Sequence, residues 1–259
     1  MSVGEVIVET QSLTKEFKGF VAVNDVNLKV VRGTIHALIG PNGAGKTTCF
    51  NLLTKFLIPT RGRILFNGQD ITVERPAQIA RRGIIRSFQI SATFPHLTVL
   101  DNVRTALLSR TDKTFRFWES ERSLEALNGR ALELLDTVGL REFAAYVTVE
   151  LPYGRKRALE IATTLAMDPQ LMLLDEPTAG MGHEDVERVT QLIRKVAANR
   201  TVLMVEHNMN VVATIADTIT VLSRGQVIAE GRYEVVSKNP QVLEAYMGSA
   251  EVELQGAHG

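Results

Sequence analysis

The chain has 259 residues, of which 45% are hydrophobic and 22% charged, and its 29 basic residues balance its 29 acidic ones. Such a composition is typical of a folded globular protein with a sizeable core, and it gives no reason to expect nucleic acid or an anionic membrane as a partner. The single cysteine, Cys49, excludes an internal disulfide and is compatible with a reducing compartment. Apolar runs extend over only a few residues, far fewer than the ~20 that a membrane-spanning helix needs, so a role at a membrane would require a partner that spans it.

The first third of the chain is predicted to consist mainly of β-strands. β-Branched and apolar residues gather in short segments, at 6–8, 26–30, 35–39 and 63–66. Turn-forming residues separate these segments, and the strongest turn signal is Asn67-Gly68, which is typical of a tight hairpin.

Residues 40–47 read Gly-Pro-Asn-Gly-Ala-Gly-Lys-Thr and fit the phosphate-loop pattern G-x-x-x-x-G-K-[ST]. The segment follows the apolar strand at 35–39 and precedes a predicted helix at 48–56. Glycines allow successive N–H groups to face one anion, and the start of the helix adds partial positive charge. The pattern predicts that Lys46 binds the β- and γ-phosphates of a nucleotide and that the Thr47 hydroxyl binds Mg²⁺. The alternative is a glycine-rich turn that binds nothing.

The middle of the chain has helical periodicity, and the last third returns to strands. Apolar residues recur at helical spacing over 99–107 and 124–138, which predicts a helical subdomain at about 91–165. Buried strands are then predicted at 171–174, 202–205 and 219–222, with a helix over 184–198 between the first two. Apolar strands that alternate with helices favour a parallel sheet covered on both faces.

The strand at 171–174 is followed by two acids, Asp175 and Glu176. Carboxylates at the carboxyl end of a strand can reach the ligand crevice of an open α/β sheet. Asp175 is predicted to hold Mg²⁺ through water, and Glu176 to orient or deprotonate an attacking water. The alternative is that the two acids simply begin a surface loop.

From about residue 6 to residue 248, the order and spacing of these motifs resemble the ATP-binding subunits of ABC transporters. The resemblance implies an α/β fold, the P-loop NTPase of the ABC ATPase type, with a mixed sheet core, an N-terminal antiparallel β part and an inserted α-helical subdomain. It implies one ABC ATPase domain over 1–248, with a RecA-like core at about 1–90 and 166–248 and the helical subdomain at about 91–165. Residues 249–259 would form a polar tail.

The resemblance also assigns roles to single residues. Phe17 is implied to stack on adenine, although it could be a core phenylalanine. Gln89 is implied to join Mg²⁺ and the attacking water to the helical subdomain; the alternative is a solvated glutamine at a strand end. His207 is implied to contact the γ-phosphate and the same water; the alternative is a polar residue that only caps a strand. The implied catalytic residues are thus Glu176, His207 and Gln89. The implied metal ligands are Thr47, Gln89 and Asp175. The implied ATP-binding residues are Phe17, Asn42, Gly43, Ala44, Gly45, Lys46, Thr47, Thr48, Leu151, Gly154 and Arg155.

Two segments depart from the family pattern. Residues 151–155 stand where the family commonly has Leu-Ser-Gly-Gly-Gln, and here only Leu151 and Gly154 are identical. Pro152 replaces the serine, so a hydroxyl contact with the γ-phosphate held by the opposite subunit cannot form. Gly182 replaces an aspartate that links the two sites across the family's dimer.

Several stretches are similar to the ATPases of branched-chain amino acid importers: 20–25, 94–103, 159–162 and 239–248. The resemblance implies a transport-coupled ATPase that uses ATP and Mg²⁺ and powers import of branched-chain amino acids or related small polar solutes. Its implied partners are integral-membrane permease subunits, a second ATPase subunit (identical or a sister chain) in a nucleotide-sandwich dimer and, indirectly, a periplasmic or extracellular solute-binding protein. The expected location is peripheral, at the cytoplasmic face of the inner membrane, with no nucleic-acid partner.

Two alternatives remain open on the sequence. The first is that the residues at 84–89 and 94–103 are also similar to those of ATPases that serve lipid or lipopolysaccharide export. A soluble ABC-type ATPase that acts on DNA or ribosomes is the second alternative, although the chain has no sustained heptads and only one cassette. A GTPase is disfavoured because no Asn-Lys-x-Asp segment occurs.

Overall fold

The computed structural model describes residues 4–87, 93–109 and 121–247. An antiparallel sheet forms at the N-terminal end of the chain, and its strands have the order β2-β1-β5-β6, with β3 paired to β1. The strands are β1 (Val6–Phe17), β2 (Phe20–Val26), β3 (Lys29–Val31), β5 (Arg61–Phe66) and β6 (Gln69–Asp70). The N-terminal antiparallel β part is therefore confirmed.

The prediction of one strand over 26–30 was wrong, because Val26 ends β2 and Lys29 begins β3. Asn27 lies between the two strands, and its side-chain Oδ1 accepts a hydrogen bond from the Ser12 N–H at 2.8 Å.

A second sheet has the order β11-β10-β4-β9-β8-β7 and is the centre of the molecule. Its strands are β4 (Ile35–Ile39), β7 (Ile84–Ser87), β8 (Leu171–Asp175), β9 (Thr201–Val205), β10 (Thr218–Ser223) and β11 (Gln226–Gly231). All neighbours are parallel except β10 and β11, so the sheet is mixed, as expected. Because β4, β8 and β9 are parallel neighbours, the segments that follow their carboxyl ends meet at one edge of the sheet.

Alternate residues of each central strand face two different hydrophobic clusters, as the period of two in a strand requires. Leu173 and Leu203 face the cluster that contains α1 (Lys46–Leu53), α2 (Pro76–Arg82) and the N-terminal strands. Met172, Leu174 and Met204 face the other cluster, together with α5 (Tyr153–Ala166), α6 (His183–Ala197) and α7 (Met209–Ile215).

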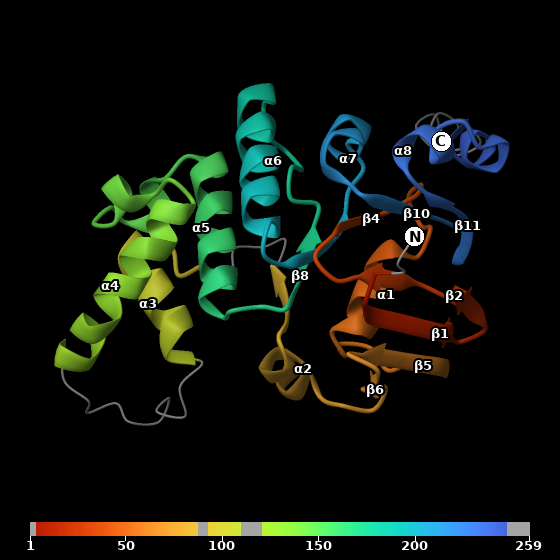
Figure 1. Cartoon of the computed structure of the whole chain (residues 1–259), viewed down its shortest axis with the longest axis horizontal. Helices are drawn as coiled ribbons and strands as arrows, with labels where there is room; N and C mark the ends of the chain where they lie inside the picture. Colours follow the sequence, from red (N-terminus) through yellow and green to blue (C-terminus); the bar gives the residue numbers. More distant parts are fainter. Residues whose placement is uncertain (1–3, 88–92, 110–120, 248–259) are drawn as a thin grey trace.

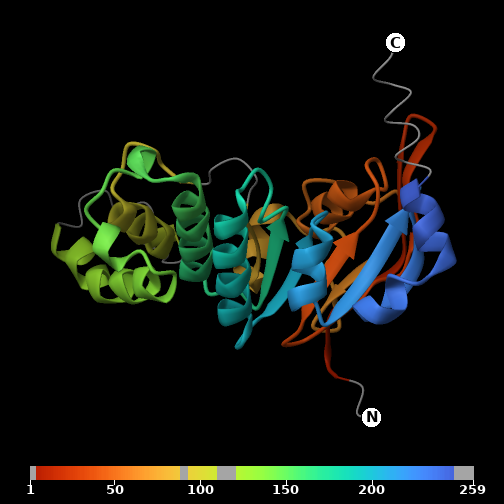
Figure 2. The ribbon, with the colours of Figure 1, turned by 90° about the horizontal axis from the view of Figure 1, so that it is seen from above.

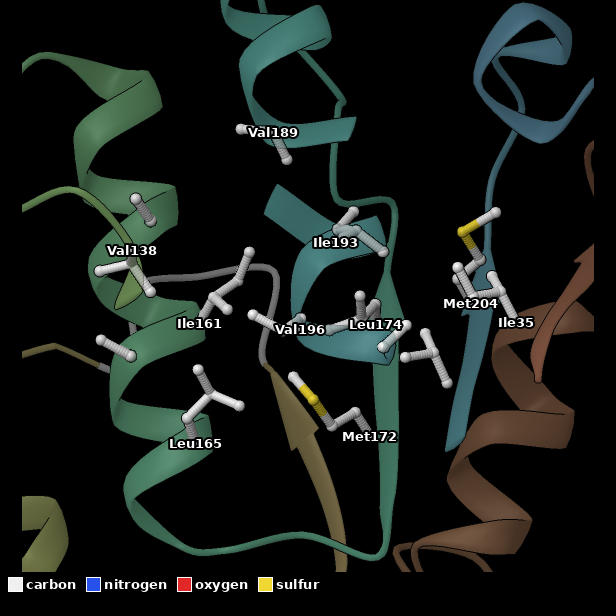
Figure 3. Close-up of a cluster of buried hydrophobic side chains, with 14 of the residues drawn as sticks. Ile35, Val138, Ile161, Leu165, Met172, Leu174, Val189, Ile193, Val196 and Met204 are labelled. Carbon is white, nitrogen blue, oxygen red and sulfur yellow. The ribbon is translucent and has the colours of Figure 1, made fainter. Parts of the chain in front are cut away.

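Figure 3 shows this second cluster, where side chains of α5, α6 and β8 point toward one another. Ile161 and Leu165 come from α5, Ile193 from α6 and Met172 from β8, and each is at most 2% exposed. Helix α5 is thus fixed directly against the strand that ends in Asp175.

Helices α3 (Val99–Ser109) and α4 (Glu121–Thr137) pack with α5 at one end of the molecule, away from β1 and β5 (Figures 1 and 2). Two short 3-10 turns, Arg141–Phe143 and Thr148–Glu150, lead from α4 to α5. The last described elements are α8 (Tyr233–Val236) and a helical segment at 240–247. Within the described part of the chain, no helix has both the length and the apolar character needed to span a bilayer.

Candidate functional site

The phosphate loop joins β4 to α1, as predicted, although α1 begins at Lys46 rather than at residue 48 and ends at Leu53 rather than at 56. Gly40 and Gly45 have φ of 147° and 101°. A Cβ on Gly40 would lie 2.1 Å from the Leu222 carbonyl oxygen, and a Cβ on Gly45 would lie 2.5 Å from the Ala22 carbonyl oxygen. Both positions therefore require glycine, for conformation and for space.

Lys46 lies where the loop and the acidic pair meet. Its Nζ donates to the carbonyl oxygens of Gly40 at 2.7 Å and Pro41 at 2.9 Å. Burial lowers the pKa of Lys46, and the negative charges of Glu176 and Asp175 partly oppose that effect. The structure thus brings together the lysine and the two acids that the sequence placed about 130 residues apart.

The other predicted loop residues differ in accessibility. Asn42, Gly43 and Thr47 are exposed, Thr48 is half-buried and Ala44 is buried. A ligand could therefore reach the exposed side chains directly, whereas Ala44 can contribute only its backbone.

Phe17 ends β1 with 40% of its surface exposed, so it is not the core phenylalanine of the alternative interpretation. The Lys15 ammonium lies 5.0 Å from the centroid of the Phe17 ring. An accessible ring beside a cation suits stacking on a flat, electron-rich base.

Asp175 is buried between two arginines that sequence reasoning did not assign to the site. The Arg86 guanidinium on β7 makes a short hydrogen-bonded ion pair with its carboxylate, and the Arg157 guanidinium on α5 donates to its carbonyl oxygen at 2.8 Å. Arg157 also donates to the Pro177 carbonyl oxygen at 3.2 Å. The sequence signal for Arg86 is a basic residue that follows two apolar residues in its strand, whereas Arg157 belongs to a run of three basic residues at 155–157.

Glu176 follows immediately and has a left-handed φ of 45°, which is uncommon for a residue with a side chain. Its N–H donates to the Val205 carbonyl oxygen at 2.9 Å, so the turn after β8 is tied to the end of β9. Backbone strain of this kind is often found at functional sites.

His207 follows β9 with 61% of its side chain exposed, next to the fully buried Glu206. The Glu206 carboxylate accepts the His207 N–H at 2.8 Å and the Asn208 N–H at 3.0 Å. It also accepts the Thr178 N–H at 3.1 Å and the Thr178 hydroxyl. Sequence reasoning missed Glu206, which ties the loop after Glu176 to His207; the signal was an acid that continues an apolar strand.

The segment that corresponds to the family signature begins α5. The Leu151 side chain is buried in the core, and a Cβ on Gly154 would lie 2.5 Å from an Asp185 carboxylate oxygen. The Arg155 guanidinium lies over the Phe143 ring, 4.0 Å from its centroid. Any contact of Leu151 or Gly154 with a nucleotide would therefore come from the backbone, and Arg155 is engaged within its own subunit.

Gln89 lies outside the described residues. Among the described residues, no group of three or more histidine, cysteine or acidic side chains could hold a metal by itself. Asp175 and Thr47 supply hard oxygen donors, which suit a Mg²⁺ ion whose other ligands are phosphate oxygens and water. The residues present thus fit a metal that arrives with a nucleotide.

The chain is similar to known ATP-binding cassettes over nearly all of its length. The family model described as ABC transporter matches residues 23–179, and the model described as Branched-chain amino acid ATP-binding cassette transporter matches residues 226–252. BraF of Pseudomonas aeruginosa, a high-affinity branched-chain amino acid transport ATP-binding protein, is 41% identical over 254 residues, which cover 94% of this chain and 98% of BraF.

Solved structures agree with these matches. The ADP conformation of MJ1267, an ATP-binding cassette of an ABC transporter, superposes with a TM-score of 0.83 at 30% identity and covers 94% of this chain and 99% of MJ1267. A dimeric post-hydrolysis structure of the cassette MJ0796 with ADP and Pi superposes with a TM-score of 0.73 at 28% identity, over 87% of this chain and 98% of MJ0796. The chain therefore belongs to the nucleotide-binding ATPase family of ABC transporters, in the branch of the branched-chain amino acid transport ATP-binding proteins.

Proposed function

We propose that this chain powers an importer of branched-chain amino acids or related small polar solutes, from the cytoplasmic face of the cell membrane. The observation that carries the proposal is the 41% identity to BraF over 94% of the chain, together with the C-terminal match to a model of the same transport type. The ATPase does not itself touch the solute, so the cargo is inferred from the branch rather than from the site.

In the proposed site, Phe17 stacks on adenine while the glycine loop and Lys46 hold the β- and γ-phosphates. Lys46 can turn from the carbonyl oxygens of Gly40 and Pro41, which accept its hydrogen bonds, toward a phosphate. The cost of that turn is offset because a charge-assisted bond to phosphate replaces neutral acceptors.

The metal would be held by Thr47, Asp175 and Gln89, and bound Mg²⁺ neutralises charge on the β- and γ-phosphates. Glu176 then orients or deprotonates the attacking water, and His207 contacts the γ-phosphate and that water. Glu206 keeps His207 in place through its hydrogen bonds to the His207 and Asn208 N–H groups. Most of the catalysis in this scheme is positioning and charge stabilisation.

The proposed active form is a dimer with an identical or sister ATPase. The nucleotide on one phosphate loop would be bridged by residues 151–155 of the other subunit, including Arg155. Helix α5 begins at Tyr153 with no side-chain cap, so the N–H groups of its first turn can meet an anion. The dimeric MJ0796 structure supports this arrangement by analogy.

We further propose that the RecA-like core spans about 1–90 and 166–248 and that a helical subdomain spans about 91–165. The packing of α3 and α4 on α5, apart from the N-terminal strands, supports that division. Closure of the dimer would move the helical subdomain against a membrane permease, and a solute-binding protein would deliver cargo on the other side.

The partner proposal is tested by affinity purification of the full chain from detergent-solubilised native membranes, followed by mass spectrometry. Recovery of one or two polytopic permeases, with or without a second ATPase, is expected. Recovery of ribosomes or nucleic-acid enzymes in their place would overturn the transport assignment.

The cargo proposal is tested by uptake of radiolabelled leucine, isoleucine and valine in cells whose only copy of the chain carries Lys46→Ala. Uptake is expected to fall to background, whereas the surface variant Glu187→Gln should import normally. Undiminished uptake of all three amino acids, with a defect in lipid export, would identify the alternative transporter class.

A further inference from the structure

Arg86 is a largely buried cation whose guanidinium contacts the carboxylate to which the proposed function assigns Mg²⁺. Its side chain is 10% exposed and that of Asp175 is 3% exposed, and the two form a direct ion pair. Strands β7 and β8 are parallel neighbours, with Ser87 opposite Leu174, so the pair crosses between adjacent strands at their carboxyl ends.

The guanidinium is also held from the side of α1, the helix that follows the phosphate loop. Arg86 Nη1 donates to Asn51 Oδ1 at 2.6 Å, and the guanidinium carbon lies 5.7 Å from the centroid of the Phe50 ring. Its planar fork therefore spans from β8 to α1 with fixed geometry, which the point charge of a lysine would not reproduce.

A buried arginine in this place has two physical consequences for a cation. The guanidinium fixes the orientation of the Asp175 carboxylate, and its positive charge repels a divalent ion that approaches the same oxygens. The charge of Lys46, which also interacts with Asp175, adds to this repulsion. The negative charge of a polyphosphate offsets both cations, so the repulsion is strong for a free metal ion and weak for a metal–nucleotide complex.

We infer that Arg86 is a positioning residue that makes the Asp175 site selective for metal–nucleotide over free metal. The inference depends on the proposed role of Asp175 as the metal carboxylate. Arg86 would weaken binding of a metal ion that arrives without phosphates, and would orient the Asp175 carboxylate for a metal ion that arrives with them. If Arg86 served only the stability of the fold, its replacement would change the affinities for free metal and for metal–nucleotide to the same extent.

The test uses Mn²⁺ as an oxygen-preferring probe of the purified full chain, with binding measured by electron paramagnetic resonance without nucleotide and with a non-hydrolysable ATP analogue. Arg86→Gln is expected to bind free Mn²⁺ about tenfold more tightly than the wild type, because one nearby positive charge is removed. Arg86→Lys, which keeps the charge, should stay near the wild type. Affinity for Mn²⁺ with the analogue should change much less in both variants.

Arg82→Gln is the matched control, because Arg82 makes a half-buried ion pair with Glu74 rather than with Asp175, and its replacement should leave both affinities unchanged. Thermal unfolding verifies that each variant is folded, and Arg86→Met, which also removes the charge, replaces Arg86→Gln in the test if the latter does not fold. Free Mn²⁺ bound no more tightly by Arg86→Gln than by the wild type would overturn the inference. Equal tightening in Arg86→Lys and Arg86→Gln would do the same.

Asp175→Asn separates this result from the proposed function. If Asp175→Asn leaves Mn²⁺ affinity with the analogue unchanged, then the metal role of Asp175 fails and the inference fails with it. If Asp175→Asn loses that affinity but Arg86→Gln behaves as the wild type, only the inference about Arg86 fails.

Discussion

Replacing Glu206 with alanine is expected to destabilise the fold and to reduce ATP turnover. The Glu206 carboxylate is fully buried and accepts hydrogen bonds from the Thr178 N–H, the Thr178 hydroxyl, the His207 N–H and the Asn208 N–H. These donors belong to two loops, one after Glu176 and one after β9. Truncation would release both loops at once.

The magnitude follows from the four donors that lose their acceptor. Each buried donor left without a partner costs about 1–3 kcal/mol, whereas removal of a buried charge returns part of its desolvation penalty. The net destabilisation of Glu206→Ala is therefore expected to be about 3–5 kcal/mol. Glu206→Gln keeps one acceptor oxygen but places an amide NH₂ group against N–H and O–H donors. The free energy of unfolding of this variant should therefore be lower by about 1–3 kcal/mol.

The assay is urea unfolding of the full chain, followed by steady-state phosphate release in the variants that fold. Glu206→Gln should bind nucleotide normally but turn over at least about tenfold more slowly, because His207 loses its backbone anchor. Glu187→Gln, which changes an acid that is 65% exposed on α6, serves as the control. An unfolding free energy of Glu206→Ala within about 0.5 kcal/mol of the wild type would refute the reasoning.

Three other perturbations test single features. Burial lowers the pKa of His36 from 6.5 to about 4, so the free energy of unfolding is unaffected by this group above pH 6.5 and falls by about 3 kcal/mol in all as the pH drops toward 4. His36→Gln, which can still form a hydrogen bond with the Thr220 hydroxyl, should lose less stability between pH 6.5 and 4 in urea unfolding. A pH dependence equal to that of the wild type would contradict this expectation. Burial lowers the pKa of Lys55 to about 8, so its charged form opposes folding below pH 8 and ceases to do so toward pH 10.5. Lys55→Met should therefore raise the free energy of unfolding by about 1–3 kcal/mol at pH 7, after allowance for partial solvation. An unchanged urea midpoint in Lys55→Met would contradict this expectation. Gly45→Ala should weaken nucleotide binding in fluorescence titrations far more than Gly43→Ala, whose added Cβ meets nothing within 4 Å, and equal effects would rule out the steric argument.

The sequence predicted the parts of the fold that depend on short-range patterns. The apolar runs of β8 and β9, followed by acids or a histidine, identified buried strands whose carboxyl ends carry polar groups. The glycine pattern identified the strand–loop–helix unit around Lys46. In each case one local segment contains the whole signal.

The parts that escaped prediction depend on contacts between distant segments. Arg86 meets Asp175 across 89 positions, and Glu206 meets Thr178 across 28. A charged residue in an apolar strand has the same local pattern whether it faces water or a buried partner. The position of Arg155 over Phe143 likewise depends on how the 3-10 turns fold back on α5, which no local pattern encodes.

In the proposed function, this chain hydrolyses ATP with Glu176 acting on the attacking water. The most direct measurement is phosphate release by the wild type and by Glu176→Gln, each with its co-purified permease, together with nucleotide affinity and size-exclusion chromatography in ATP. We expect Glu176→Gln to bind ATP as the wild type does, to lose most of its turnover and to accumulate as a closed dimer. Turnover in Glu176→Gln equal to that of the wild type would contradict the role of Glu176 in hydrolysis.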